Sequence, residues 1–98
     1  MKMYVLIRND LDEIQKSVQA GHAVAEYLLH VPECFKFWKN GTLIYLQVKN
    51  EHDLIKWSYK LTNLSKKWIG FHEPDRKNEM TALACLDNNG IFKKLRLL

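Results

Sequence analysis

Apolar residues follow two different periods along the first third of the chain. Met3–Ile7 is a nearly continuous apolar run, which is typical of a strand covered on both faces. Apolar positions then recur every three or four residues, and this spacing predicts a helix that ends near His30, before Pro32. Asp12, with Gln15 three residues later, resembles a helix-capping arrangement. The positions that carry the helical repeat are Ile14, Val18, Gly21, Ala25 and Leu28.

The middle of the chain continues the alternation of strands and helices. Cys34–Lys39 reads as an irregular aromatic connection, and Thr42–Val48 is the clearest strand in the sequence. Asn50 is a suitable cap for a second helix, with Asp53 in its first turn. The residues expected on one side of that helix are Leu54, Trp57, Ser58 and Leu61.

The last third predicts two strands joined by a short loop. Trp68–Glu73 and Met80–Leu86 have strand character, and only the polar segment Pro74–Glu79 separates them. Asn88-Asn89-Gly90 then turns the chain into Ile91–Leu98, for which helix and strand are both open.

The element order β-α-β-α-β-β predicts an α/β fold. The first two crossovers must be parallel and right-handed, whereas the short last connection favours an antiparallel pair. We therefore expect a small mixed four-stranded sheet flanked by helices, in three layers α/β/α, as one domain over residues 1–98. Ligands of such sheets gather beyond the carboxyl ends of parallel strands. Here those ends are Arg8–Asp10, Lys49–Asn50 and His72–Asp75.

Composition narrows the class of protein. The 98 residues are 47% hydrophobic and 27% charged, as in soluble globular domains. No apolar run approaches the ~20 residues that span a bilayer, so we expect no membrane partner. The N-terminus lacks a signal-peptide layout, and Cys34 and Cys85 form no disulfide framework. A cytoplasmic protein with reduced thiols is the simplest interpretation.

The net charge of +4 permits a polyanionic partner without establishing one. Lysines are spread from Lys36 to Lys67 and return at Lys93, Lys94 and Arg96, with no single block of like charge. A solvated surface explains them about as well as an RNA-binding face does.

His22 is the first candidate for chemistry because it lies in a run of small residues on the predicted first helix. Histidine titrates near neutral pH, so an accessible one is a candidate acid or base. The alternative is that Ala20, Gly21, Ala23 and Ala25 form a packing face and His22 is a core residue.

Most familiar catalytic signatures are missing. The chain has no glycine-rich phosphate loop, no Gly-x-Ser-x-Gly elbow and no His-Glu-x-x-His helix. Its four histidines lack metal-site spacing, and we therefore predict no metal and no cofactor. Cys85 fits a small core residue better than a nucleophile. Trp57 and Trp68 are interpreted as packing residues, whereas Trp38 is a candidate for exposure, for stacking or a dimer contact.

Two segments resemble a known family. Lys2–Leu11, followed by Gln19–Ala23, is similar to the opening of type II peptidyl-tRNA hydrolases. That family begins with a Lys-Met-Val-like strand ending in Arg-x-Asp-Leu and continues to a helix bearing Ala-Gln-x-x-His-Ala. Lys94–Leu98 also resembles the family's Leu-Lys-Leu ending, so the similarity extends over essentially the whole chain.

The resemblance implies a metal-independent esterase, without a cofactor, that cuts the ester between a peptide and the 3′ ribose of tRNA. It also implies a tRNA partner and a homodimer, since the family is commonly dimeric. It assigns catalytic roles to Lys16, His22, Glu73 or Asp75, and Thr81, and substrate binding to Arg8, Asp10, Gln19 and Lys77.

The chain departs from the family in two loops. A Gly-Lys-Gly-Lys loop is shortened here to Asp12–Lys16, which leaves the register of Lys16 ambiguous by one residue. An Asp-Ala-Gly-Arg-Thr segment becomes Glu73–Lys77, without its threonine, so either Glu73 or Asp75 stands for the family's acid.

These residues lead to one hypothesis for a catalytic mechanism, and two alternative functions remain beside it. In the hypothesis, the acid and His22 deprotonate a water that attacks the ester, and Lys16 stabilises the developing oxyanion. The first rival is a non-catalytic module of the same fold that binds tRNA or a protein through the same edge. The second is a small dimeric structural protein whose basic surface is incidental.

Overall fold

The computed structural model describes residues 1–98 and contains every predicted strand and helix. The elements are β1 (Lys2–Arg8), α1 (Glu13–His30), a 3₁₀ helix η1 (Pro32–Lys36), β2 (Leu43–Val48), α2 (Glu51–Asn63), β3 (Trp68–Glu73), a 3₁₀ turn η2 (Pro74–Arg76) and β4 (Glu79–Asp87). Both predicted helix caps are confirmed. The Asp12 carboxylate accepts the Gln15 N–H at 2.8 Å, and the Asn50 side chain accepts the Asp53 N–H at 3.0 Å.

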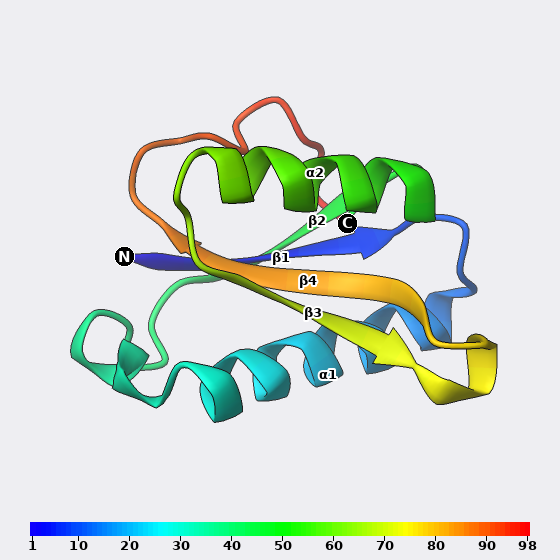
Figure 1. Ribbon diagram of the computed structural model, residues 1–98, viewed down its shortest axis with the longest axis horizontal. Helices are drawn as coiled ribbons and strands as arrows, with labels where there is room; N and C mark the ends of the chain where they lie inside the picture. Colours follow the sequence, from blue (N-terminus) through cyan, green and yellow to red (C-terminus); the bar gives the residue numbers. More distant parts are fainter.

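The four strands form one mixed sheet in the order β2-β1-β4-β3. β1 and β2 pair in parallel, and β4 is antiparallel to both of its neighbours, so β1, β2 and β3 all run in the same direction. α1 covers one face and α2 the other (Figure 1), which confirms the three-layer α/β/α prediction.

Alternating side chains of the strands supply two cores. Met3, Val5 and Ile7 of β1 face α1, whereas Leu6 faces α2. This two-sided burial explains why β1 is an almost uninterrupted apolar run.

The rotation of α1 differs from the one its apolar repeat indicates. An apolar stripe ordinarily faces a core, but Ile14, Val18 and Leu28 are 75%, 42% and 43% exposed. Gly21 and Ala25 of the same stripe are exposed as well. The residues that α1 buries are Lys16, Gln19, Ala20, Ala23 and Tyr27.

Small residues and polar contacts explain this rotation. Ala20 and Ala23 pack in the same cluster as Ala82 and Ala84 of β4, so the helix and the sheet approach closely. Gln19 is meanwhile held by polar groups at the end of the sheet. Ala20 and Ala23 therefore pack against the sheet, as expected of the alanine and glycine face. Gly21 and Ala25, which were expected on the same face, are exposed on the opposite side of the helix.

The aromatic and cysteine predictions have mixed outcomes. Trp38 is only 6% exposed and donates its indole N–H to the Thr42 carbonyl at 2.8 Å, so the expectation of an exposed Trp38 is wrong. Cys85 is fully buried in the α2-side core, as predicted, and burial raises the pKa of its thiol to about 12.

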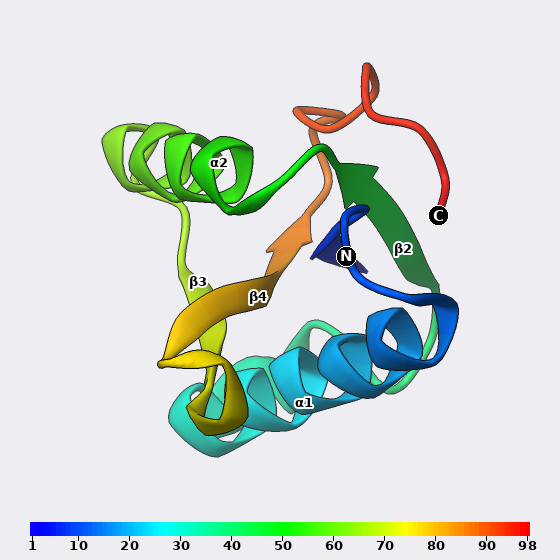
Figure 2. The same cartoon turned by 90° about the vertical axis from the view of Figure 1, so that its right-hand side faces the viewer.

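The C-terminal segment is neither a helix nor a full strand. Ile91–Leu95 turns over the α2 side of the sheet, where Phe92 is buried with its ring 5.0 Å from Tyr4 and 5.3 Å from Trp57. Leu97 then forms an isolated antiparallel bridge with Leu46 on the free edge of β2 (Figure 2). We call residues 91–98 the C-terminal strap. Neither helix of the fold has the length and apolar character needed to cross a membrane.

Candidate functional site

The carboxyl ends of β1, β2 and β3 lie at one edge of the sheet, which Figure 2 faces. The first residues of α1, α2 and β4 lie at the same edge. We call this edge the rim. Side chains far apart in the sequence meet there, as the predicted strand directions require.

A buried chain of hydrogen bonds connects α1 to β3 and β4 at the rim. The Thr81 hydroxyl donates to Gln19 Oε1 at 2.6 Å, and Gln19 Nε2 donates to Glu73 Oε1 at 2.9 Å. Gln19 Nε2 also donates to Gln15 Oε1 at 3.1 Å. Gln19 and Thr81 are fully buried, so this chain fixes the Glu73 carboxylate. Glu73 Oε2 accepts no hydrogen bond from the protein.

A β-bulge aims Thr81 into this chain. Phe71 pairs with Ala82 and His72 with Met80, which leaves Thr81 as an extra residue in β4. Met80 packs in the α2-side core, whereas Ala82 packs on the α1 side and Thr81 reaches Gln19 on that same side. The bulge therefore re-aims one side chain next to the candidate site, a common role of such irregularities.

Lys16 lies one helical turn before Gln19 and is also buried, at 7% exposure. Its ammonium donates to Asn9 Oδ1 and to Glu13 Oε1, each at 2.8 Å. The structure thus places the lysine at the rim with two of its three N–H donors already used.

Arg8 forms a second polar cluster at the rim. Its guanidinium binds Asp10 through two hydrogen bonds of 3.0 Å and Glu79 through one of 2.7 Å. These hydrogen bonds hold the pKa of the Asp10 and Glu79 carboxyls below their ordinary values. Arg8 is only 5% exposed, and its charge is already matched by these two carboxylates.

His22 is exposed on α1, one turn beyond Gln19. Its ring stacks on Phe71 of β3, with 4.4 Å between ring centroids and 9° between the planes. Neither ring nitrogen makes a hydrogen bond within the protein. His22 is therefore accessible, as expected, and is not a core residue, although Ala20 and Ala23 do pack as the alternative expected.

Asp75 and Lys77 are the two predicted residues whose side chains have no partner in the protein. Both are exposed on the loop between β3 and β4, and neither side chain has a hydrogen bond or an ion pair within the protein. Lys16 and His22 do have partners, but only residues outside the predicted set. Either Glu73 or Asp75 was expected to stand for the family's acid, and of these two only Glu73 contacts Gln19.

Asn9, Glu79 and Arg76 are, like Glu13 and Gln15, rim residues outside the predicted site. Asn9 binds Lys16, Glu79 binds Arg8, and Arg76 Nε lies 3.7 Å from Glu79 Oε1 without a hydrogen bond. Asn9 and Arg76 adjoin predicted residues in sequence, so proximity alone could have flagged them. Glu79 carries no local signal, because its role depends on a contact with a residue 71 positions away.

The residues of the rim provide an acid, an imidazole, an amide, a hydroxyl and an ammonium group, which suit water activation and anion stabilisation. No group of three or more histidine, cysteine or acidic side chains is arranged to hold a metal ion. Comparison of the chain with known protein families and with curated protein sequences finds no match. The assignment of a function therefore rests on the residues described above.

Proposed function

We propose that the chain is a peptidyl-tRNA hydrolase-like esterase of the cytoplasm, with its reaction centre at the rim. The observation that supports this best is the buried Thr81–Gln19–Glu73 chain, which holds a carboxylate with one free oxygen. The exposed His22 ring stacks on Phe71, two residues before Glu73 in β3. Because the Glu73 carboxylate is already held in position, little free energy is needed to reorganise the site when this carboxylate accepts a proton.

In the proposed reaction, a water bound at Glu73 Oε2 attacks the carbonyl carbon of the ester. Its proton passes to Glu73 or to His22 as the new carbon–oxygen bond forms. The bond to the ribose oxygen then breaks, and that oxygen takes up the proton. Lys16 uses its remaining N–H donor to stabilise the negative charge that develops on the carbonyl oxygen.

A non-catalytic module that binds tRNA or a protein through the same rim is the alternative. The observation that favours it is the environment of Lys16, whose ammonium is buried and held by Asn9 and Glu13. Such a lysine has a clear structural role without any substrate.

Hydrolysis of peptidyl-tRNA by charge-removing variants tests the proposal. We expect Glu73→Gln to lower turnover by ~100-fold or more, a typical loss for a general base. Asp75→Asn removes the same charge two residues away, in the loop after β3, but the Asp75 side chain has no hydrogen bond or ion pair within the protein, so this variant should retain turnover. The assay measures release of labelled N-acetylated peptide from peptidyl-tRNA with EDTA present, and circular dichroism confirms folding of each variant.

Folded wild type without turnover would reject the esterase and favour the binding module. Equal losses in both variants would show that net charge, and not the fixed Glu73 carboxylate, matters. His22→Ala, which removes an exposed side chain, should lower turnover without unfolding the protein.

We also propose that the chain forms a homodimer through the exposed stripe of α1. The stripe is roughly self-complementary: a two-fold axis at Gly21 places Ile14 opposite Leu28, each seven residues away, while Val18 and Ala25 lie three and four residues from the axis. Large residues thus meet at the ends and small ones in the middle. The acidic first turn of each helix lies opposite the basic last turn of the other, and the helix dipoles are antiparallel.

Gly21 gives independent support for a second copy. A Cβ atom added at Gly21 would meet nothing within 4 Å, so the single chain has no packing reason for glycine there. Glycine inside a helix costs ~1 kcal/mol relative to alanine. Close approach of another helix is a reason to retain it.

A further inference from the structure

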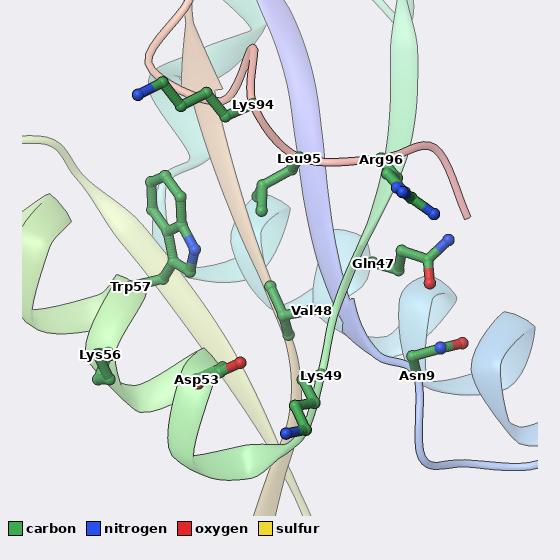
Figure 3. Close-up of a pocket in the computed structure, with 10 residues that line it drawn as sticks. All are labelled: Asn9, Gln47, Val48, Lys49, Asp53, Lys56, Trp57, Lys94, Leu95 and Arg96. Carbon is green, nitrogen blue, oxygen red and sulfur yellow. The ribbon is translucent and has the colours of Figure 1, made fainter.

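A groove lies on the α2 side of the sheet, opposite the buried Gln19 chain. Its cavity of about 490 Å³ is enclosed by the end of β2, by α2 and by the C-terminal strap (Figure 3). Val48, Trp57 and Leu95 supply its apolar lining. The volume falls within the range of small-ligand sites, roughly 300–1,000 Å³.

Positive charge dominates the border of this groove. Its four cationic side chains are Lys49, Lys56, Lys94 and Arg96, and Asp53 is the single carboxylate. All four cations are exposed, and none takes part in an ion pair. This differs from Arg8, whose charge is matched by carboxylates, so the groove presents uncompensated charge in a concave surface that attracts anions.

An aromatic side chain distinguishes the groove from an ordinary basic surface. Trp57 is half-buried, lies across the groove from Leu95, and packs against Phe92 with 5.3 Å between ring centroids (Figure 3). The Lys60 ammonium lies 4.5 Å from its ring. Cations that track phosphates and an aromatic face that stacks on a base are the two components of single-stranded nucleic acid sites.

Hydrogen bonds and a buried ring hold the backbone of the strap in place. The Gln47 N–H donates to the Arg96 carbonyl and the Leu98 N–H donates to the Tyr45 carbonyl, each at 3.0 Å. Buried Phe92 anchors the preceding turn. A ligand therefore meets a preformed wall, which lowers the ordering cost of binding.

Asn9 connects the groove, on the α2 side of the sheet, with Lys16 of α1 at the rim. Asn9 lines the groove, and its side-chain oxygen accepts a hydrogen bond from the Lys16 ammonium at 2.8 Å. Lys16 in turn lies one helical turn from Gln19. A strand lying in the groove would therefore emerge at the rim next to Lys16.

We propose that this groove binds a single-stranded RNA segment, with its phosphates at Lys49, Lys56, Lys94 and Arg96 and a base stacked on Trp57. The proposal rests on the proposed function, because it identifies the groove as the place where the end of the tRNA is held. A flat anionic membrane fits less well, since these cations line a concave surface.

Binding of a dye-labelled, ester-free oligoribonucleotide, followed by fluorescence anisotropy over a range of salt concentrations, tests the groove. We expect Lys56→Gln/Lys94→Gln to weaken binding and to reduce the slope of log affinity against log salt by about 1.4, for two lost phosphate contacts. The matched control, Lys36→Gln/Lys39→Gln, removes two exposed lysines outside the groove and should behave like wild type.

Trp57→Leu tests the stacking contact separately. It should weaken binding by at least about fivefold while leaving the salt slope unchanged, because no phosphate contact is lost. Thermal unfolding verifies that this variant is folded. If it is not folded, the comparison of the two double-lysine variants still tests the groove.

Equal affinity and slope for the groove variant and its control would overturn the proposal, even for an active hydrolase. Binding to phosphatidylserine vesicles that needs Lys56 and Lys94, in the absence of RNA binding, would also overturn it. The ligand contains no ester, so lack of hydrolysis would reject the proposed enzyme without affecting this result.

Discussion

Gln19 is the residue on which the candidate site depends most directly. Its side-chain oxygen accepts from Thr81, and its amide group donates to Gln15 and Glu73. Because Gln19 is fully buried, each of these bonds replaces one that water would otherwise supply. The carboxylate of Glu73 is therefore positioned by the folded core.

Removal of the Thr81 hydroxyl should destabilise the protein. Thr81→Val keeps the shape of the side chain but leaves the buried Gln19 oxygen without its donor. We expect a loss of about 1–3 kcal/mol in the free energy of unfolding, measured by urea denaturation. Thr42→Val makes the same change at an exposed position and should stay within about 0.5 kcal/mol of wild type. Equal stability of the two variants would contradict the role given to this hydroxyl.

At the scale of the elements, α1 has two distinct faces. Its inner face supplies Lys16 and Gln19 to the rim, and its outer face carries the apolar stripe from Ile14 to Leu28. If the stripe pairs two copies, the exposed His22 of each chain lies close to the subunit boundary. The proposed dimer and the proposed site are then built on one helix.

Gly21→Ala separates the stability of the chain from its association. Alanine meets no atom of its own chain and should stabilise the isolated subunit by ~1 kcal/mol through helix propensity. The added methyl groups should nevertheless weaken the dimer, because they lie where the two helices approach. Sedimentation velocity over a range of concentrations measures association, and urea denaturation of dilute protein measures stability.

Ser17→Ala is the control, since it also raises helix propensity at an exposed position of α1 but lies beside the stripe. A wild-type chain that stays monomeric at all concentrations would reject the dimer. Unchanged association of Gly21→Ala would reject close contact at this glycine.

At the scale of the whole molecule, ion pairs secure both ends of the sheet. Arg8, Asp10 and Glu79 connect β1 and β4 at the rim. At the far end of β4, Asp87 is fully buried. Burial alone would raise its pKa, but hydrogen bonds from Lys66 and from the N–H groups of Asn89 and Ile91 outweigh this and lower it.

These ion pairs predict a loss of stability in acid. The carboxyl pKa of Asp10 and of Asp87 lies below the ordinary value of 3.8, and that of Glu79 below 4.5. Since folding lowers these pKa values, their contribution is complete above the ordinary values and is lost as the pH falls through the folded-state values. Urea denaturation from pH 6 down to about pH 2 should show this decline.

The free energy of unfolding of Asp10→Asn/Glu79→Gln should decline less steeply with falling pH than that of wild type. The decline that remains should be due to Asp87. Glu33→Gln/Asp75→Asn removes two exposed carboxylates outside any ion pair and should leave the decline unchanged. Identical curves for all three proteins would exclude the rim ion pairs as its source.

The element order, both helix caps and the α/β class could be predicted from the sequence. These features depend on local signals: apolar periodicity, an Asp or Asn side chain that reaches the third N–H of its helix, and a short connection between β3 and β4. The convergence of Arg8 and Glu73 at one rim also followed, because strand direction places the ends of β1 and β3 together. The contact of Gln19 with Glu73 depends in addition on the rotation of α1.

The folded structure was needed to show which face of α1 is buried, where Thr81 points, and that the strap forms a groove with α2. The apolar repeat of α1 indicated the wrong face because contacts with Ala82, Ala84 and Glu73, which are remote in sequence, set the rotation of the helix. The bulge at Thr81 depends on the register between two strands, and the groove depends on Phe92 packing against Tyr4 and Trp57. Such contacts have no local sequence signal, since they form only when the complete sheet brings their partners together.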